Sequence, residues 1–316
     1  MGGSDLLITP IGLGTWQFSK RRNLIGRFWP YLSDEESYDI VTTSFHNGIN
    51  WFDTAEAYGN GESEKTLSRA LQHTGLKDED VVIATEWNPF FRTAGSITRT
   101  IGKRLEALNP YTISLHQIHN PYSFSGIASE MKAMARLIKE QKIRQVGVSN
   151  FTAKQMQKAY QELSRYGVQL VANQVPYNLL NRKIERNGIL EAARAMNVSI
   201  VAYSPLAQGL LTGKYHEDPE SIKQKKGFRK RMPSFKAKGL EKTRPLIDKL
   251  KELALKYNAT PAQIALNWTI NFYEEFIVAI PGASNPQQAE SNALAMQIDL
   301  TAEDKKQIDK LSLDIS

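Results

Sequence analysis

The sequence predicts an α/β fold in which eight parallel strands close into a (β/α)8 TIM barrel with extra C-terminal helices. Short runs rich in β-branched residues alternate with longer amphipathic segments along the chain. This alternation indicates parallel βαβ units, and eight of them in about 280 residues fit a closed barrel better than an open sheet. No Gly-x-Gly-x-x-Gly follows a strand, so a doubly wound dinucleotide fold has no support.

The strands are expected where short apolar runs end in turn residues or polar groups. Their ranges are 11–14, 49–53, 81–85, 112–119, 143–148, 170–174, 199–203 and 276–280. Between them the helical period predicts helices over 34–46, 63–72, 96–108, 126–140, 152–163, 187–196 and 260–271. Ser33 before three acidic residues and Thr260 before Pro261 are favourable helix starts.

Two further helical stretches, 242–256 and 301–312, exceed a minimal barrel. No internal repeat or linker divides the chain, so residues 1–316 are expected to form a single barrel domain.

Composition narrows the classes of protein. The chain has no cysteine, which excludes a disulfide framework and a thiolate metal site, and we expect no metal. No apolar run approaches the ~20 residues of a membrane span, and the first residues lack the pattern of a secretory signal. We therefore expect a cytoplasmic protein without membrane insertion, and the oligomeric state cannot be inferred.

The net charge of +7 is concentrated in one segment. Residues 223–244 carry ten basic side chains against the single acid Glu241. Such a segment indicates an anionic ligand or simple solvation. Neither a basic helix nor an aromatic stacking platform accompanies it, so nucleic acid is not an expected partner.

Polar and aromatic groups follow the expected strands directly. They include Asp53, Thr85, Glu86, His119, Asn120, Ser149, Asn150, Gln174, Tyr203, Ser204 and Gly282. In a barrel the carboxyl ends of all strands meet at one mouth, where active sites are built. One strand end carries both Asp53 and, five residues on, Tyr58, which places two proton-active groups on one short loop.

Seven motifs in order make the chain resemble the aldo-keto reductases from residue 11 to about 295. They begin at Gly12, Phe52, His116, Gly147, Asn173, Tyr203 and Ile280, reading GLGTW, FDTA with a following YG, HQIH, GVSNF, NQVPYN, YSPL with GLLTGK, and IPGAS. The resemblance implies a barrel that binds NADP(H), preferred over NAD(H), at its C-terminal mouth. It also implies hydride transfer to a small-molecule aldehyde, ketone or related carbonyl.

The resemblance also assigns roles to single residues. Tyr58 is implied as the proton donor to the carbonyl oxygen, Asp53 as its electrostatic partner and His119 as a neutral hydrogen-bonding group; with Glu86, these are the expected catalytic residues. The implied cofactor-binding residues are Gly14, Thr15, Trp16, Asp53, Ser149, Asn150, Gln174, Tyr203, Ser204, Leu206, Gly209, Lys214, Gly282, Ser284, Gln288 and Asn292. The expected substrate pocket comprises Trp16, Trp29, Tyr58, Trp87, His119 and Tyr122.

The chain departs from the family pattern at Glu86. The pattern has a lysine here, which pairs with the aspartate and makes the phenol more acidic. At ~4 Å and an effective dielectric of ~20, reversing that charge turns an attraction of about 4 kcal/mol into a similar repulsion. Asp53 and Glu86 are then expected to compete for one proton, so that one of them stays neutral near pH 7.

The departure at Glu86 leaves two functions open. In the first, the protein is an NADPH-dependent carbonyl reductase. In the second, it is a cofactor-binding sensor or regulatory subunit, resembling in role the potassium-channel β subunits, with weak or no catalysis. A second departure, Ser291 in place of a glutamate found in many relatives, affects the expected adenosine end of the site.

The basic segment after the seventh strand generates a prediction. Residues 214–231 are expected to close over the cofactor phosphates, since barrels commonly bind phosphate after strands seven and eight. NADP(H) should then bind more tightly than NAD(H), and its affinity should fall as ionic strength rises. Fluorescence titrations with both cofactors at low and high salt measure this; equal affinities that do not respond to salt contradict it.

Overall fold

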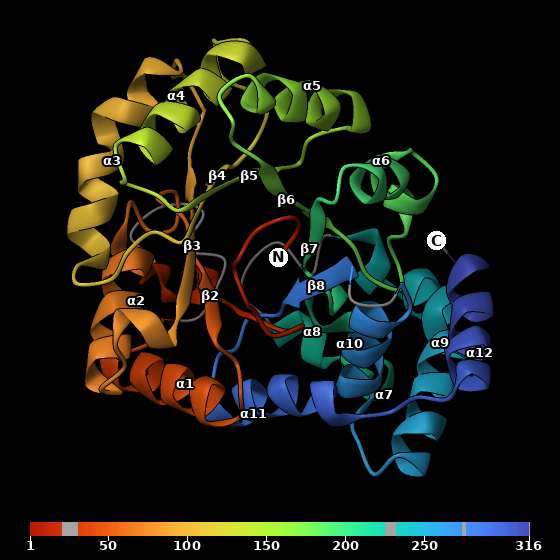
Figure 1. The fold of residues 1–316 in the computed structure, drawn as a ribbon. Helices are drawn as coiled ribbons and strands as arrows, with labels where there is room; N and C mark the ends of the chain where they lie inside the picture. Colours follow the sequence, from red (N-terminus) through yellow and green to blue (C-terminus); the bar gives the residue numbers. More distant parts are fainter. Residues whose placement is uncertain (21–30, 225–231, 274–275, 316) are drawn as a thin grey trace.

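The computed structural model describes residues 1–20, 31–224, 232–273 and 276–315, and it confirms the (β/α)8 barrel. Eight strands form one parallel sheet in chain order, with helices arranged around it (Figure 1). The strands are β1 (Leu13–Gly14), β2 (Trp51–Asp53), β3 (Val82–Trp87), β4 (Leu115–Ile118), β5 (Gln145–Ser149), β6 (Leu170–Pro176), β7 (Ser199–Tyr203) and β8 (Ile277–Ile280).

Parallel bridges between the first and last strands close the sheet. Ile11 pairs with Ala279 and Gly14 pairs with Gly282, and the Gly14 amide donates to the Pro281 carbonyl over 3.1 Å. A Cβ added at Gly14 would lie 2.9 Å from the Ile280 carbonyl oxygen. Glycine at this position therefore allows the two backbones to approach closely enough to complete the barrel.

The helices around the barrel follow the expected order. They are α1 (Asp34–His46), α2 (Glu62–His73), α3 (Gly95–Leu108), α4 (Ile127–Lys139), α5 (Ala153–Ser164), α6 (Ile189–Ala195) and α10 (Pro261–Asn271). Ser33 and Thr260 form capping boxes with Glu36 and Gln263, which explains why α1 and α10 begin where the sequence predicts.

The remaining helices lie between β7 and the end of the described chain. They are α7 (Lys214–Glu217), α8 (Ser221–Gln224), α9 (Ala237–Lys256), α11 (Pro286–Leu294) and α12 (Ala302–Leu313). Helix α9 begins earlier than the predicted range 242–256, and α11 was not predicted. Asn285 caps α11 by accepting from the Gln288 amide, and this start faces the mouth of the barrel.

The N-terminal segment packs against the interior of the barrel. Leu6 is buried among Trp51, Ala84 and Leu115, in a cluster made of strand residues that point inward. The Trp51 indole donates to the Thr9 carbonyl over 2.9 Å, which fixes the segment to β2. The N-terminus consequently appears at the centre of the ring of strands in Figure 1. Among the described residues, no helix combines the length and apolar character of a membrane span.

The burial of Leu6 predicts its contribution to stability. Leu6→Ala should lower the free energy of unfolding by about 2–5 kcal/mol, because it removes a buried side chain from a packed cluster. Leu7 is 85% exposed, so Leu7→Ala is the matched control and should change the free energy of unfolding by no more than about 0.5 kcal/mol. Urea denaturation of both variants measures these changes. Equal losses of stability for Leu6→Ala and Leu7→Ala would contradict the packing role of Leu6.

Candidate active site

The C-terminal mouth of the barrel opens into a cavity of about 1250 Å³. Small-molecule pockets commonly occupy about 300–1,000 Å³, so this cavity has room for an extended ligand. Every residue that the sequence analysis assigned to cofactor binding lines it: Gly14, Thr15, Trp16, Asp53, Ser149, Asn150, Gln174, Tyr203, Ser204, Leu206, Gly209, Lys214, Gly282, Ser284, Gln288 and Asn292. Tyr58 and His119 line the same cavity.

The cavity also has polar lining residues that were not predicted. They are Gln17, Gln208, Thr212, Asn285 and Gln287. Each lies within a few positions of a predicted motif, so proximity to the motifs was the only available signal. All five carry neutral amide or hydroxyl groups, which can both donate and accept hydrogen bonds.

Asp53 lies at the end of β2 and points into the barrel, where its side chain is almost fully buried. Its Oδ2 accepts from Gln117 Nε2 over 3.3 Å and from Gln174 Nε2 over 3.0 Å. Burial and the negative charge of Glu86 raise the pKa of Asp53 well above its usual range, against the lowering effect of the two amides. Asp53 therefore keeps its proton to a much higher pH than an exposed aspartate does.

Glu86 is fully buried on β3, where it is in register with Gln117 of β4. Its Oε2 lies 2.9 Å from His119 Nδ1. The sequence analysis paired Glu86 with Asp53 for a shared proton. Glu86 does raise the pKa of Asp53, but the direct contact of its carboxylate is with the histidine, because His119 turns back from the end of β4 toward β3.

His119 follows β4, and its backbone is held on both sides. Its amide donates to the Trp87 carbonyl over 3.1 Å, and its carbonyl accepts from Asn150 Nδ2 over 3.2 Å. Burial lowers the pKa of the imidazole, but the nearby charge of Glu86 raises it by more, so the net pKa lies above the ordinary value. The contact with Glu86 therefore shifts His119 toward the imidazolium, whereas the sequence analysis expected a neutral imidazole.

Tyr58 lies on the segment between β2 and α2, beside His119. The two rings meet edge to face with centroids 5.9 Å apart, and the Trp16 ring stacks on Tyr58 at 6.0 Å. Burial and then the charges of Glu86 and Asp53 raise the pKa of the Tyr58 phenol well above its usual value. Tyr58 is therefore a neutral hydrogen-bond donor near pH 7 and a poor acid.

The loop after β7 and the start of α11 form the other end of the cavity. Ser204, Ala207 and Gln208 have positive φ angles of 51°, 49° and 59°, and Gly209 has 90°. These left-handed residues make tight backbone turns in the loop, a feature that anion-binding loops share. The cation of Lys214 and the N-terminus of α11 add positive potential at this end.

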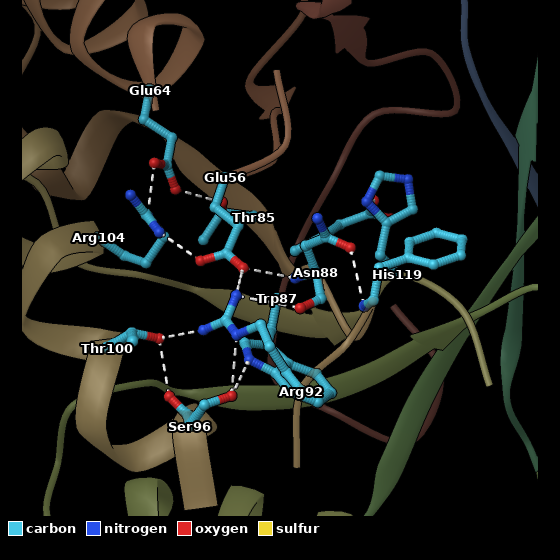
Figure 2. A network of polar contacts seen from close by, with 12 residues as sticks. Glu56, Glu64, Thr85, Trp87, Asn88, Arg92, Ser96, Thr100, Arg104 and His119 are labelled. Atoms are coloured by element: carbon cyan, nitrogen blue, oxygen red, sulfur yellow. Dashed lines mark hydrogen bonds and ion pairs between the residues drawn. The ribbon is translucent and has the colours of Figure 1, made fainter. Parts of the chain in front are cut away.

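A buried network of charged residues lies behind β3 and was missed by the sequence analysis (Figure 2). Glu56 forms ion pairs with Arg92 and, over 2.5 Å, with Arg104. Arg104 also contacts Glu64 over 2.6 Å, and the backbone amide of Asn88 donates to the Glu56 carboxylate over 2.8 Å. The network ties β3 and the loop after it to α2 and α3, and it has no signal in the local sequence.

The expected substrate pocket is only partly reproduced. Trp16, Tyr58 and His119 line the cavity, whereas Trp29 lies outside the described residues. Trp87 does not line the cavity: it is buried with its indole donating to Ser96 on α3 over 3.1 Å. Tyr122 is 61% exposed and does not line the cavity either. Trp87 faces outward because side chains alternate along a strand and Glu86 takes the inward direction.

Comparison with known proteins agrees with this geometry. The model of the Aldo/keto reductase family matches residues 10–313. The chain belongs to the aldo/keto reductase family. Members of this family are oxidoreductases, and a curated relative from Mycobacterium tuberculosis is named an uncharacterized oxidoreductase; it is 36% identical over 94% of this chain and 87% of its own.

Two further relatives have more specific names. The chloroplastic pyridoxal reductase of Arabidopsis thaliana is 30% identical over 96% of this chain and 83% of its own length. The solved structure of a glycerol dehydrogenase from Gluconobacter oxydans superposes with a TM-score of 0.82 at 29% identity, and the match covers 98% of this chain and 93% of that one. This chain therefore shares both sequence and fold with aldo/keto reductase family oxidoreductases.

The network behind β3 generates a stability prediction. Arg104→Met leaves Glu56 and Glu64 without the cation between them, and it should cost about 3–5 kcal/mol, as expected for an uncompensated buried charge. Lys103 is exposed on the same helix, so Lys103→Met is the matched control and should change stability by less than about 0.5 kcal/mol. Urea denaturation at pH 7 measures both; a loss for Arg104→Met no larger than the control's contradicts the network's role.

Proposed function

We propose that the protein reduces an aldehyde, ketone or related carbonyl to the alcohol, with NADP(H) as the cofactor. The observation that carries the proposal is that Tyr58, His119 and Lys214 all line one cavity. A carbonyl oxygen needs hydrogen-bond donors where negative charge develops, and the cofactor phosphates need cations and backbone amides. When bound, the cofactor supplies the hydride.

The lining residues suit an extended dinucleotide. Ser149, Asn150 and Gln174 place hydroxyl and amide groups beside Asp53, where a nicotinamide carboxamide is proposed to bind. Tyr203 offers a ring face for the nicotinamide, and its hydroxyl donates to Asn150 Oδ1 over 3.1 Å, which fixes the ring. The pyrophosphate is proposed at Ser204, Leu206, Gly209 and Lys214, and the adenosine at Gly282, Ser284, Gln288 and Asn292.

The substrate class follows from the groups at the mouth. The aromatic side chains of Trp16, Tyr31 and Tyr58 line the cavity. Rings of this kind beside polar groups suit a bulky or planar carbonyl compound. The names of the relatives, a pyridoxal reductase and a glycerol dehydrogenase, are consistent with chemistry at a carbonyl or alcohol group.

Loss of the Lys214 charge tests the cofactor assignment. Lys214→Met should raise the Kd for NADPH about tenfold or more, since hydrogen bonds to a charged partner contribute about 1.5–3 kcal/mol. Lys238 is exposed on α9 and does not line the cavity, so Lys238→Met is the control and should leave the Kd unchanged. Fluorescence titration gives both values, and an unchanged Kd for Lys214→Met contradicts the assignment.

The reaction itself is tested with the wild-type protein. NADPH and a panel of aldehydes, ketones and quinones should give a substrate-dependent loss of absorbance at the reduced nicotinamide band. If the protein binds NADPH but oxidises it with no carbonyl in the panel at any pH, the proposed reaction is wrong.

A further inference from the structure

The candidate reaction centre is unusual because two buried carboxyl groups lie there on neighbouring strands. Asp53 and Glu86 lie on adjacent strands and are both almost fully buried. Within the described ranges, neither forms an ion pair with a lysine or arginine, and the partner of Glu86 is His119. Among the described residues, the imidazole of His119 is therefore the cationic partner in contact with Glu86.

The geometry fixes which nitrogen of His119 is available. Nδ1 lies 2.9 Å from Glu86 Oε2 and is committed to that contact. The other nitrogen, Nε2, is left for the cavity, which His119 lines with a side chain that is 22% exposed. A carboxylate on one nitrogen sets the tautomer of a histidine and stabilises its charged form.

Other ionisable groups face His119 from several elements. Besides Glu86 on β3, they are Asp53 on β2, Glu56 and Tyr58 on the segment after β2, and Tyr203 on β7, which interacts electrostatically with Tyr58 and Glu86. Glu56 is already paired with Arg92 and Arg104. Glu86 is therefore the carboxylate that acts on His119 directly.

Tyr58 is less suited to give up a proton. Ionisation of its phenol would place a second negative charge beside that of Glu86, in a buried part of the site. An acid works best when its pKa is near the operating pH, and an imidazolium meets that condition better than a phenol in this setting. The edge-to-face contact at 5.9 Å makes the two rings neighbours in the wall of the cavity.

We propose that Glu86 holds His119 as an imidazolium and that His119 Nε2, rather than Tyr58, gives the proton to the carbonyl oxygen. This inference rests on the proposed function. As the carbonyl carbon accepts hydride from the reduced nicotinamide, the C=O π electrons move to oxygen, the Nε2–H bond breaks and an O–H bond forms. His119 is left neutral and regains a proton from solvent, the nicotinamide is oxidised, and Tyr58 donates a hydrogen bond without losing its proton.

Kinetics of three variants test the assignment of the acid. His119→Gln should lower kcat by about 10²–10⁴-fold, the usual loss for a general acid, whereas Tyr58→Phe should lower it by about tenfold or less. Glu86 is a positioning residue, so Glu86→Gln should move the alkaline fall in kcat/KM to lower pH by at least about one unit. Glu130→Gln, a buried glutamate on α4 away from the cavity, is the control and should leave the profile unchanged.

The opposite pattern overturns the proposal. If Tyr58→Phe lowers kcat by 10²-fold or more while His119→Gln keeps most of the wild-type kcat, Tyr58 is the acid. The carbonyl reductase function then stands, but proton donation by His119 does not. If the wild type reduces no carbonyl, the proposed function is wrong, and proton donation by His119 is overturned with it.

A second readout needs neither cofactor nor substrate. The double variant Glu86→Gln/His119→Gln, together with the wild type and both single variants, completes a thermodynamic cycle that isolates the coupling between the two side chains. The pKa of His119 is higher in the folded protein than in the unfolded chain, where it is about 6.5. The coupling free energy between Glu86 and His119 should therefore be fully present below about pH 6.5. It should disappear as the pH rises through the pKa of His119 in the folded protein. Coupling that is absent, or constant from pH 5 to 9, overturns the imidazolium.

Discussion

The closure of β1 onto β8 is the constraint on which the rest of the structure depends. Parallel bridges at Ile11 and Gly14 turn an eight-stranded sheet into a barrel, and only a closed barrel brings the carboxyl ends of all strands to one mouth. Residues as distant in sequence as Asp53 and Gln174 thereby come within a hydrogen bond of each other. The cavity, its polar lining and its reaction centre all follow from that convergence.

Within this frame, charge decides how the site works. Asp53 is surrounded by amides and by the Glu86 carboxylate, so it retains its proton. Tyr58 lies near the same Glu86 carboxylate and also retains its proton. Glu86 is the group that connects these effects, because it raises the pKa of Asp53, Tyr58 and His119 together. The imidazole is the one member of this group whose charged form is favoured by such surroundings, since its charge is opposite to that of Glu86.

Much of the fold could be predicted because its signals are local. Helix α1 and strand β7 have the predicted bounds, since a Ser33 cap and a short β-branched run are complete within a few residues. The residues that line the cavity could be placed because strand ends converge in any barrel. The prediction that Trp87 lies in the substrate pocket was wrong. The alternation of side chains along β3 could have shown this, because an inward Glu86 requires an outward Trp87. The contact of Glu86 with His119 and the Glu56–Arg104 pair could not be predicted, because residues on separate strands or 48 positions apart meet only after folding.

The protonation state of His119 is the central claim, and histidine NMR measures it most directly. The chain has five histidines, and comparison with His119→Gln assigns the His119 signal in a pH titration of the cofactor-free protein. The account predicts a His119 pKa above the ordinary value of about 6.5, with a proton on Nδ1 toward Glu86, and a fall of at least about one unit in Glu86→Gln. A pKa at or below the ordinary value in the wild type, unchanged by Glu86→Gln, would contradict the account.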